Sequence, residues 1–465
     1  MKSPTQKPIL ALIKEKISSA AFRRYSEQTL WLLLEKVVRL VLGLGVSMWL
    51  MRYLGVEAFG KLSYAQSFAT LFLPLATFGL TDIITKELIL RRFSEGQVLG
   101  TAFALRLLGS CLFIAASIGI GYFYEPQQEK FALIFIIVFG YFFTFFDVTL
   151  YYFQSEVKSA VVMQLQIFVF VLISILKISF IFLEKSLFFF AIATALETAF
   201  NSLVYFLYYH LKKKKDLDLD NKPLDLEIKT AITWQYEKKL SQHFVKLALP
   251  LLLSNALMLI YMRTDQIMIE YFLTDTDNGN YAAAVRISEL WYFVPMSIAA
   301  AVFPAILHAK KEAPQRYQKR LQQLFDLMVW LGISVAFALS LTATWLIKLF
   351  AGEAYLGAVG SLQIYAWAGV FVSLGTASGK WLYAESLEKI VFFRTLLGAL
   401  LNVGANFFLI PLWGIEGAAW GSLFSFALAH VLSNAFHPLL RPLFMLQIRA
   451  FLLPLRFWGV FVVKK

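Results

Sequence analysis

Charge and cysteine are both scarce in this sequence of 465 residues. Asp, Glu, Lys and Arg make up 16% of it, whereas the apolar and aromatic residues, cysteine included, make up 59%. Soluble domains carry about 25% charged and about 45–50% apolar residues. The single cysteine, Cys111, excludes a disulfide framework. The composition excludes an ordinary soluble globule, because so much apolar surface needs lipid as its solvent.

The motifs of common catalytic and metal sites are also missing. The sequence has no G-x-x-x-x-G-K-[ST] phosphate loop, and the nearest match, GTASGK ending at Lys380, has the wrong spacing. A His–Glu metal motif, a nucleophile elbow and paired cysteines are likewise not found. We therefore expect no catalytic residue, no metal site, no organic cofactor and no ATP hydrolysis by this chain.

Apolar stretches of membrane-spanning length recur along nearly the whole chain. A spanning helix needs about 20 mostly apolar residues, and twelve such stretches are present. A further apolar piece, 451–463, is too short and interrupted to count as a span. The first 29 residues are polar and basic, without the apolar core of a cleavable signal peptide. The predicted spans are 30–51, 62–84, 98–122, 130–153, 160–183, 187–210, 245–272, 281–306, 322–350, 358–383, 390–411 and 415–437.

Lysine and arginine alternate between the loops that join these spans. They gather in the N-terminus, the even-numbered loops and the tail, whereas the odd-numbered loops hold little more than Lys61, Lys130, Lys185 and Lys348. Positive loops stay in the cytoplasm, so both termini are predicted to be cytoplasmic. The net charge of +13 is explained by this rule, and no nucleic-acid partner is expected.

The longest polar segment divides the spans six and six. We predict an N-terminal segment 1–29, a first bundle 30–210, a cytoplasmic linker 211–243, a second bundle 244–437 and a cytoplasmic or interfacial tail 438–465. The halves echo each other, because LYYFQSEVKSA from Leu150 corresponds to KWLYAESLEKI from Lys380. Repeated halves are typical of transporters that rock about a central site. Prolines within the spans are candidate hinges, namely Pro74, Pro250 and Pro295.

Several motifs resemble one transporter family, the bacterial polysaccharide repeat-unit flippases of the Wzx type. They are LALPLLLSNALMLIYMRTDQIMIEYF from Leu247, GNYAAAVRISELWYF from Gly279, N-x-x-x-N-F-F-L-I-P-L-W-G-I-x-G-A-A-W from Asn402, RYLGVEAFGKLSYAQSF from Arg52 and FGLTDIITKEL from Phe78. This family belongs to the superfamily that also holds the MATE drug/cation antiporters and lipid II flippases.

The resemblance implies an all-α fold with two six-helix bundles around a central cavity. It further implies a location in the bacterial cytoplasmic membrane and a substrate that is an oligosaccharide linked to undecaprenyl diphosphate. The transporter would move this substrate by alternating access. A polysaccharide polymerase and its chain-length machinery are the protein partners that such a role suggests.

Charged residues inside the spans are the candidate site, because such charges are expensive and usually functional. Cations would bind the two phosphates of the substrate, and arginine suits phosphate through its planar fork. The candidates are Lys36, Arg39, Arg106, Arg263 and Arg286. In related exporters a carboxylate couples transport to H⁺ or Na⁺, and the candidates here are Asp147, Glu197, Asp265 and Glu289. Candidate sugar contacts are Tyr64, Gln66, Asn255, Tyr261, Tyr281, Trp291 and Tyr292.

Structural roles compete with these functional ones. Arg286 and Glu289, three residues apart on a helix, could be a simple ion pair, and Lys177 could reach the interface with its long stem. Arg263 and Asp265 are about 200° apart on a helix, so they cannot both face one cavity. Alternative functions are an ion-coupled drug or cation antiporter of the same fold and, ranked lower, a membrane polymerase or glycosyltransferase or a scaffold that transports nothing.

Overall fold

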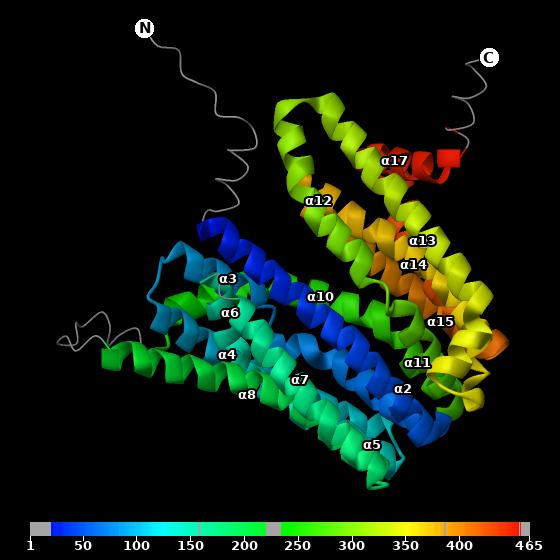
Figure 1. Cartoon of the computed structure of the whole chain (residues 1–465), viewed down its shortest axis with the longest axis horizontal. Coiled ribbons are helices and arrows are strands. Elements are labelled where there is room, and N and C mark those ends of the chain that lie inside the picture. Colours follow the sequence, from blue (N-terminus) through cyan, green and yellow to red (C-terminus); the bar gives the residue numbers. More distant parts are fainter. Residues whose placement is uncertain (1–19, 157–158, 220–233, 386, 455, 457–465) are drawn as a thin grey trace. The chain divides into compact units, whose positions relative to one another are not determined.

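The computed structural model describes residues 20–156, 159–219, 234–385, 387–454 and 456, and all regular structure in these ranges is helical (Figure 1). The helices follow the apolar stretches because a backbone in lipid must satisfy its hydrogen bonds within each segment. The all-α membrane fold that the sequence predicts is confirmed. The predictions for residues 1–19 and 457–465, and for residues 220–233 of the 211–243 linker, lie outside the described residues.

The chain forms two compact units. The first combines Met1–Ser47, Leu75–Ala116 and Ile136–Leu252, and the second combines Met48–Pro74, Ser117–Phe135 and Leu253–Lys465. The two bundles drawn from the sequence, 30–210 and 244–437, stay a prediction.

Helices that contribute to the first unit pack around Leu80, Val98, Phe153 and Phe244, which are fully buried. Many large apolar side chains of these helices remain exposed, as expected for helix faces that meet lipid. The elements are α2 (Ala20–Thr77), α3 (Thr81–Leu90), α4 (Glu95–Tyr124), α5 (Gln128–Phe142), η1 (Phe143–Asp147), α6 (Val148–Ser155), α7 (Ser159–Phe182) and α8 (Leu187–Leu219).

The remaining helices contribute mainly to the second unit, with a core that includes Leu324, Phe325, Met328 and Leu374. They are α10 (Lys238–Phe272), α11 (Asp275–Glu289), α12 (Phe293–Glu312), α13 (Pro314–Phe350), α14 (Ala358–Ala384), α15 (Glu388–Ala427), a π-helical turn (Leu428–Leu432), α16 (Ser433–Phe436) and α17 (Arg441–Phe451). Short 3₁₀ turns lie at Glu353–Tyr355 and Pro438–Leu440.

Ten apolar helical stretches in the described ranges are long enough to cross a bilayer. Two of them, Val41–Leu90 and Ile390–Phe436, are 50 and 47 residues long and each overlaps two predicted spans. Since about 20 residues suffice for one crossing, the ten stretches are compatible with the twelve predicted crossings.

Glycines interrupt both of these long stretches. Gly414 has φ 58° and ψ −140°, a conformation open to glycine. A Cβ on Gly421 would lie 2.0 Å from Oδ1 of Asn406, although fifteen residues of continuous helix would hold the two about 22 Å apart. The chain therefore folds back on itself at Gly414, between the predicted spans 390–411 and 415–437.

Gly55 makes the corresponding interruption in α2, with φ 75° and ψ 174°. The hydroxyl of Tyr355 donates to the carbonyls of Met51 and Gly55, at 3.0 and 2.9 Å. Burial raises the pKa of the Tyr355 phenol, so that the hydroxyl stays protonated and able to donate. The Tyr355 side chain thus stabilises this turn through two hydrogen bonds.

Two of the spans that are predicted as continuous helices are interrupted in the structure. The span 281–306 breaks at 290–292, so Pro295 lies in the first turn of α12, where a missing N–H is tolerated. The span 130–153 passes through the 3₁₀ turn η1, which ends at Asp147. Pro74 and Pro250 do lie within helices, α2 and α10.

The predicted tail contains an ordered helix. Within the second unit, Leu443 and Ala450 of α17 are fully buried against α13, and Trp330 of α13 donates to the carbonyl of Ala450 at 3.1 Å. Gln447 is fully buried and is hydrogen-bonded to Ser378, to Asn434 and to the carbonyl of His430. Helix α17 is therefore an integral part of this unit.

Candidate functional site

Arg106, a predicted cation of the first unit, is deeply buried, with 1% of its surface exposed. Its guanidinium donates to the Tyr151 hydroxyl at 2.9 Å and lies 3.6 Å from a carboxylate oxygen of Asp147. Tyr151 also contacts the hydroxyl of Thr81 at 3.2 Å. The candidate phosphate ligand Arg106 and the candidate coupling residue Asp147 are thus an ion pair between α4 and η1.

A second ion pair in the first unit joins α7 to α8. The Lys177 ammonium lies 2.8 Å from the Glu197 carboxylate, and both side chains are mostly buried. Lys177 therefore has a partner within the helices and does not need to reach the membrane interface. The Arg39 guanidinium lies over the ring of Phe170, 5.3 Å from its centre. The Lys36 side chain lies outside the described residues.

Asp265 is the most buried predicted carboxylate of the second unit, with 4% of its surface exposed. It accepts hydrogen bonds from the Tyr281 hydroxyl at 2.5 Å, from the backbone N–H of Gln266 at 2.8 Å and from the Ser422 hydroxyl at 3.4 Å. These donors are all neutral, in contrast to the guanidinium and ammonium groups beside Asp147 and Glu197. Protonation of Asp265 would therefore break no hydrogen bond to a cation, although the charge of Arg263 also acts on this carboxylate.

Glu289, at the end of α11, is the second predicted carboxylate of this unit. It accepts a hydrogen bond from the Tyr365 hydroxyl of α14 at 3.1 Å. Arg286, one turn earlier on α11, places its guanidinium 5.5 Å from the centre of the Phe59 ring. Arg263 lies half-buried on α10, two residues from buried Asp265, and the predicted difference between the faces of these two residues stays a prediction.

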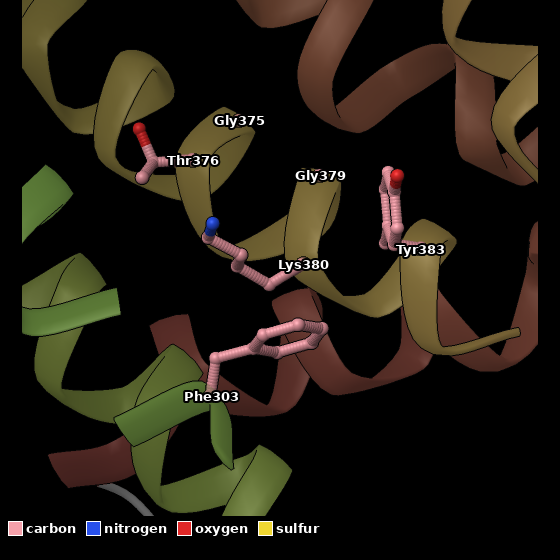
Figure 2. Close-up of a pocket in the computed structure, with 6 residues that line it drawn as sticks. All are labelled: Phe303, Gly375, Thr376, Gly379, Lys380 and Tyr383. Carbon is pink, nitrogen blue, oxygen red and sulfur yellow. The ribbon is translucent and has the colours of Figure 1, made fainter. Parts of the chain in front are cut away.

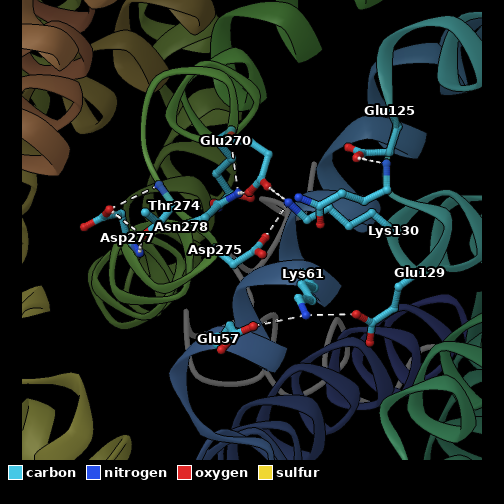
Figure 3. Close-up of polar contacts among 12 residues, drawn as sticks. Glu57, Lys61, Glu125, Glu129, Lys130, Glu270, Thr274, Asp275, Asp277 and Asn278 are labelled. Carbon is cyan, nitrogen blue, oxygen red and sulfur yellow. Dashed lines mark hydrogen bonds and ion pairs between the residues drawn. The ribbon is translucent and has the colours of Figure 1, made fainter.

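Six charged groups form a further cluster in the second unit, which we call the Lys130 cluster (Figure 3). Lys130, at the start of α5, is 4% exposed and contacts the carboxylates of Glu270 on α10 and of Asp275 on α11, the latter at 2.7 Å. Beside it, Lys61 lies 2.9 Å from Glu129 and 3.1 Å from Glu57. The Asn278 amide also donates to Glu270 at 2.9 Å.

Glycines let the backbones around the Lys130 cluster come together. A Cβ on Gly60 would stand 1.9 Å from the carbonyl oxygen of Asp275, and one on Gly279 would stand 2.0 Å from that of Val56. Such distances leave no room for any side chain. Residues 56–60 and 275–279, far apart in the sequence, are therefore in direct backbone contact.

The predicted sugar contacts differ in exposure. Tyr64, Tyr261, Tyr281 and Tyr292 are buried, Gln66 and Trp291 are half-buried, and Asn255 is exposed. Tyr261 packs on Phe426 with ring centres 4.7 Å apart. A role for these side chains in sugar binding stays a prediction.

Several charges that are prominent in the structure are not among the residues selected from the sequence. Lys130 was counted only as a loop charge, Lys380 only as the end of a false phosphate loop, and Arg394 and Glu270 were not selected. Arg394 and Glu270 lie inside predicted spans, 390–411 and 245–272, so the rule that selected Arg263 would have found them. No group of three potential metal ligands occurs among the described residues.

The fold is shared with known membrane transporters. The lipid II flippase MurJ in its inward closed conformation matches with a TM-score of 0.67 at 14% identity, over 93% of this chain and 92% of MurJ. An inward-facing multidrug resistance MATE transporter matches with a TM-score of 0.66 at 16% identity, over 89% of this chain and 94% of that one. The protein therefore has the MATE-like, all-α fold of multi-pass membrane transporters.

The family follows from sequence models. The model of the family described as polysaccharide biosynthesis protein matches residues 26–310, more than half of the chain, and the chain belongs to this family. The model described as lipid II flippase MurJ matches residues 224–453. A relative in Haloferax volcanii, the probable low-salt glycan biosynthesis flippase Agl15, is 25% identical over 180 residues. That match covers 37% of this chain and 38% of Agl15.

Proposed function

We propose that this protein is a flippase that moves a lipid-linked glycan across a membrane for polysaccharide biosynthesis. The observation that carries the proposal is the family match over residues 26–310, which the MurJ match over 224–453 extends into the second half. These matches are to flippase and transporter families and not to enzymes, which argues against the polymerase or glycosyltransferase alternative.

A more specific form of the proposal names the carrier and the route. The substrate is an oligosaccharide repeat unit on undecaprenyl diphosphate, and the protein moves it by alternating access in the cytoplasmic membrane, with both termini in the cytoplasm. Diphosphate and sugars cannot cross hydrocarbon unaided, because burying such charge without partners is prohibitive. The cations Arg39, Arg106, Arg263 and Arg286, together with Lys36, remain the proposed phosphate contacts. A polysaccharide polymerase and its chain-length machinery are proposed partners.

The partners of the four candidate carboxylates support a choice among them as the coupling residue. Asp147 and Glu197 are paired with Arg106 and Lys177, so protonating either would leave a buried cation without its partner. Asp265 and Glu289 accept hydrogen bonds from the phenol hydroxyls of Tyr281 and Tyr365. We therefore favour Asp265 and Glu289 as the groups through which H⁺ or Na⁺ couples to transport.

The Lys130 cluster fits a gate in this scheme. The loop charges predict that residues 57–61, 125–130 and 270–278 lie at the extracytoplasmic side. Alternating access requires that this side open after loading from the cytoplasm. We propose that the Lys130 contacts to Glu270 and Asp275 break in that step.

Deleting the protein tests the function directly. If it is the flippase, undecaprenyl-linked oligosaccharide accumulates on the cytoplasmic leaflet and surface polysaccharide is lost, and the intact gene restores both. The MATE-like fold makes the drug or cation antiporter the second candidate. Unchanged surface polysaccharide together with raised drug sensitivity would favour that alternative and overturn the flippase proposal.

A further inference from the structure

A hollow of about 390 Å³ lies between α12 and α14 in the second unit (Figure 2). Its lining on α14 recurs at helical spacing and so forms one face of that helix. Two of these residues are glycines, and a Cβ on Gly379 would meet no atom within 4 Å. The lack of a side chain at Gly379 therefore contributes to the space. The lining residues are Phe303, Gly375, Thr376, Gly379, Lys380 and Tyr383.

Lys380 brings a positive charge to this hollow. Figure 2 shows its side chain running towards Thr376, above the ring of Phe303, whose centre is 5.3 Å from the ammonium. No carboxylate pairs with Lys380 in the part of the chain that the structure describes. The neighbouring hollow, lined in part by Lys310, differs in this respect, because Lys310 lies 2.9 Å from Glu385. Among the described residues, the charge of Lys380 thus has no carboxylate partner, whereas that of Lys310 is paired.

A second cation, Arg394, lies behind the residues that line the hollow. A Cβ on Gly375 would lie 2.7 Å from the ring of His430, and Nδ1 of that ring is 3.4 Å from the Arg394 guanidinium. Arg394 is 7% exposed and donates to the carbonyl of Ala429 at 2.7 Å. Among the described residues, no carboxylate pairs with Arg394 either. A buried charge is costly without a counter-charge, and an anion in the hollow would reduce the cost for both cations.

We propose that this hollow binds the phosphate group of a lipid, and that under the proposed flippase function the lipid is the glycan carrier. Lysine binds phosphate as a point charge, and the exposed Tyr383 hydroxyl can donate a second hydrogen bond. The face of Phe303 offers apolar contact to the chain beside the phosphate. The loop charges predict that this end of α14 faces the cytoplasm, the side from which a carrier is loaded.

The lipid could be the carrier or an ordinary phospholipid, and binding measurements separate the two. The full-length protein in detergent is titrated with undecaprenyl diphosphate and, separately, with phosphatidylglycerol. Lys380→Gln should weaken the binding of undecaprenyl diphosphate about 10- to 100-fold, the usual loss for a hydrogen bond to a charged group. Lys380→Arg should retain most of it. The control Lys348→Gln removes a cation paired with Glu353 at 3.0 Å and should change binding less than about twofold.

A second variant tests the hollow without removing the Lys380 charge, so that the result does not depend on one substitution that could alter folding. Gly379→Leu keeps the charge of Lys380 but fills the open space, so it should also weaken binding. A greater loss for undecaprenyl diphosphate than for phosphatidylglycerol assigns the site to the carrier, and the reverse assigns it to a membrane headgroup. Unchanged binding of both lipids in both variants would overturn the proposal. If deletion of the gene still causes the linked oligosaccharide to accumulate, the flippase function survives that result.

Discussion

The ammonium of Lys130 lies 2.7 Å from the carboxylate of Asp275 and also contacts that of Glu270, so one buried lysine joins α5 to both α10 and α11. Lys130→Ala would leave two buried carboxylates without their cation. We expect it to lower the free energy of unfolding by about 3–5 kcal/mol. Chemical denaturation in detergent micelles measures this value.

A neutral version of the same cluster is the matched control. Lys130→Met combined with Glu270→Gln and Asp275→Asn removes all three charges, and it should recover most of the lost stability because neutral replacement of a buried ion group is often tolerated. Equal stability of Lys130→Ala and the unaltered protein would contradict this account of the Lys130 cluster.

Asp265 is expected to couple transport to an ion gradient, because its hydrogen-bond donors are neutral. Asp265→Asn keeps the size of the side chain but cannot exchange a proton. Export by this variant should no longer respond to dissipation of the H⁺ or Na⁺ gradient. Flipping in reconstituted vesicles with and without an imposed gradient makes the measurement.

Glu197→Gln is the comparison for Asp265→Asn. Glu197 is paired with Lys177 at 2.8 Å, so its replacement should lower stability by about 3–5 kcal/mol and leave the gradient dependence in place. Normal gradient dependence of export by Asp265→Asn would show that Asp265 is not part of the coupling site.

Arg286→Ala is expected to stop surface polysaccharide export while the protein level in the membrane stays normal. The guanidinium lies over the Phe59 ring, and a cation on an aromatic face contributes about 0.5–2 kcal/mol. Arg286→Lys keeps the cation but loses the planar fork and should rescue export only in part. Immunoblotting of membranes together with surface polysaccharide staining tests both variants. Full export by Arg286→Ala would exclude this residue from the site, and the same test applies to Arg39→Ala.

Gly279→Ala is expected to disrupt the second unit, because its Cβ would stand 2.0 Å from the carbonyl oxygen of Val56. Overpacking of this kind costs about 1–3 kcal/mol or more. A Cβ on Gly404 would meet nothing within 4 Å, so Gly404→Ala is a suitable control and should be neutral or stabilising by up to about 1 kcal/mol. Thermal unfolding of the purified variants distinguishes the two sites, and equal midpoints would argue against the close backbone contact.

Much of the fold could be predicted from the sequence because lipid imposes one dominant constraint. The helices follow the apolar stretches at Glu95–Tyr124, Ser159–Phe182 and Ala358–Ala384 within a few residues of their predicted limits. The length of each crossing is set by the bilayer and can be read without knowledge of packing. The breaks at 290–292 and 143–147 could not be found in this way, because hydropathy does not report backbone geometry.

The candidate charges could be located on their helices but not paired. Spacing along one helix places Arg286 near Glu289, but it does not reveal that Glu289 accepts a hydrogen bond from Tyr365 of α14. Arg106 meets Asp147 across a separation of 41 residues, and Lys130 meets Glu270 across 140. Such partners depend on tertiary packing, which a single sequence does not encode in any local pattern.

Helix α17 bears on the order in which the protein is completed during synthesis. Gln447 supplies the hydrogen bonds that bring Ser378 and Asn434 together with the carbonyl of His430 in the π-helical turn. These groups lie on helices that enter the membrane before residue 447 has left the ribosome. The second unit must therefore wait, with buried polar groups unsatisfied, until α17 has been synthesised. A chain whose synthesis stops before residue 447 would have the twelve predicted spans up to residue 437 but would leave this part of its core open to the cell's quality control.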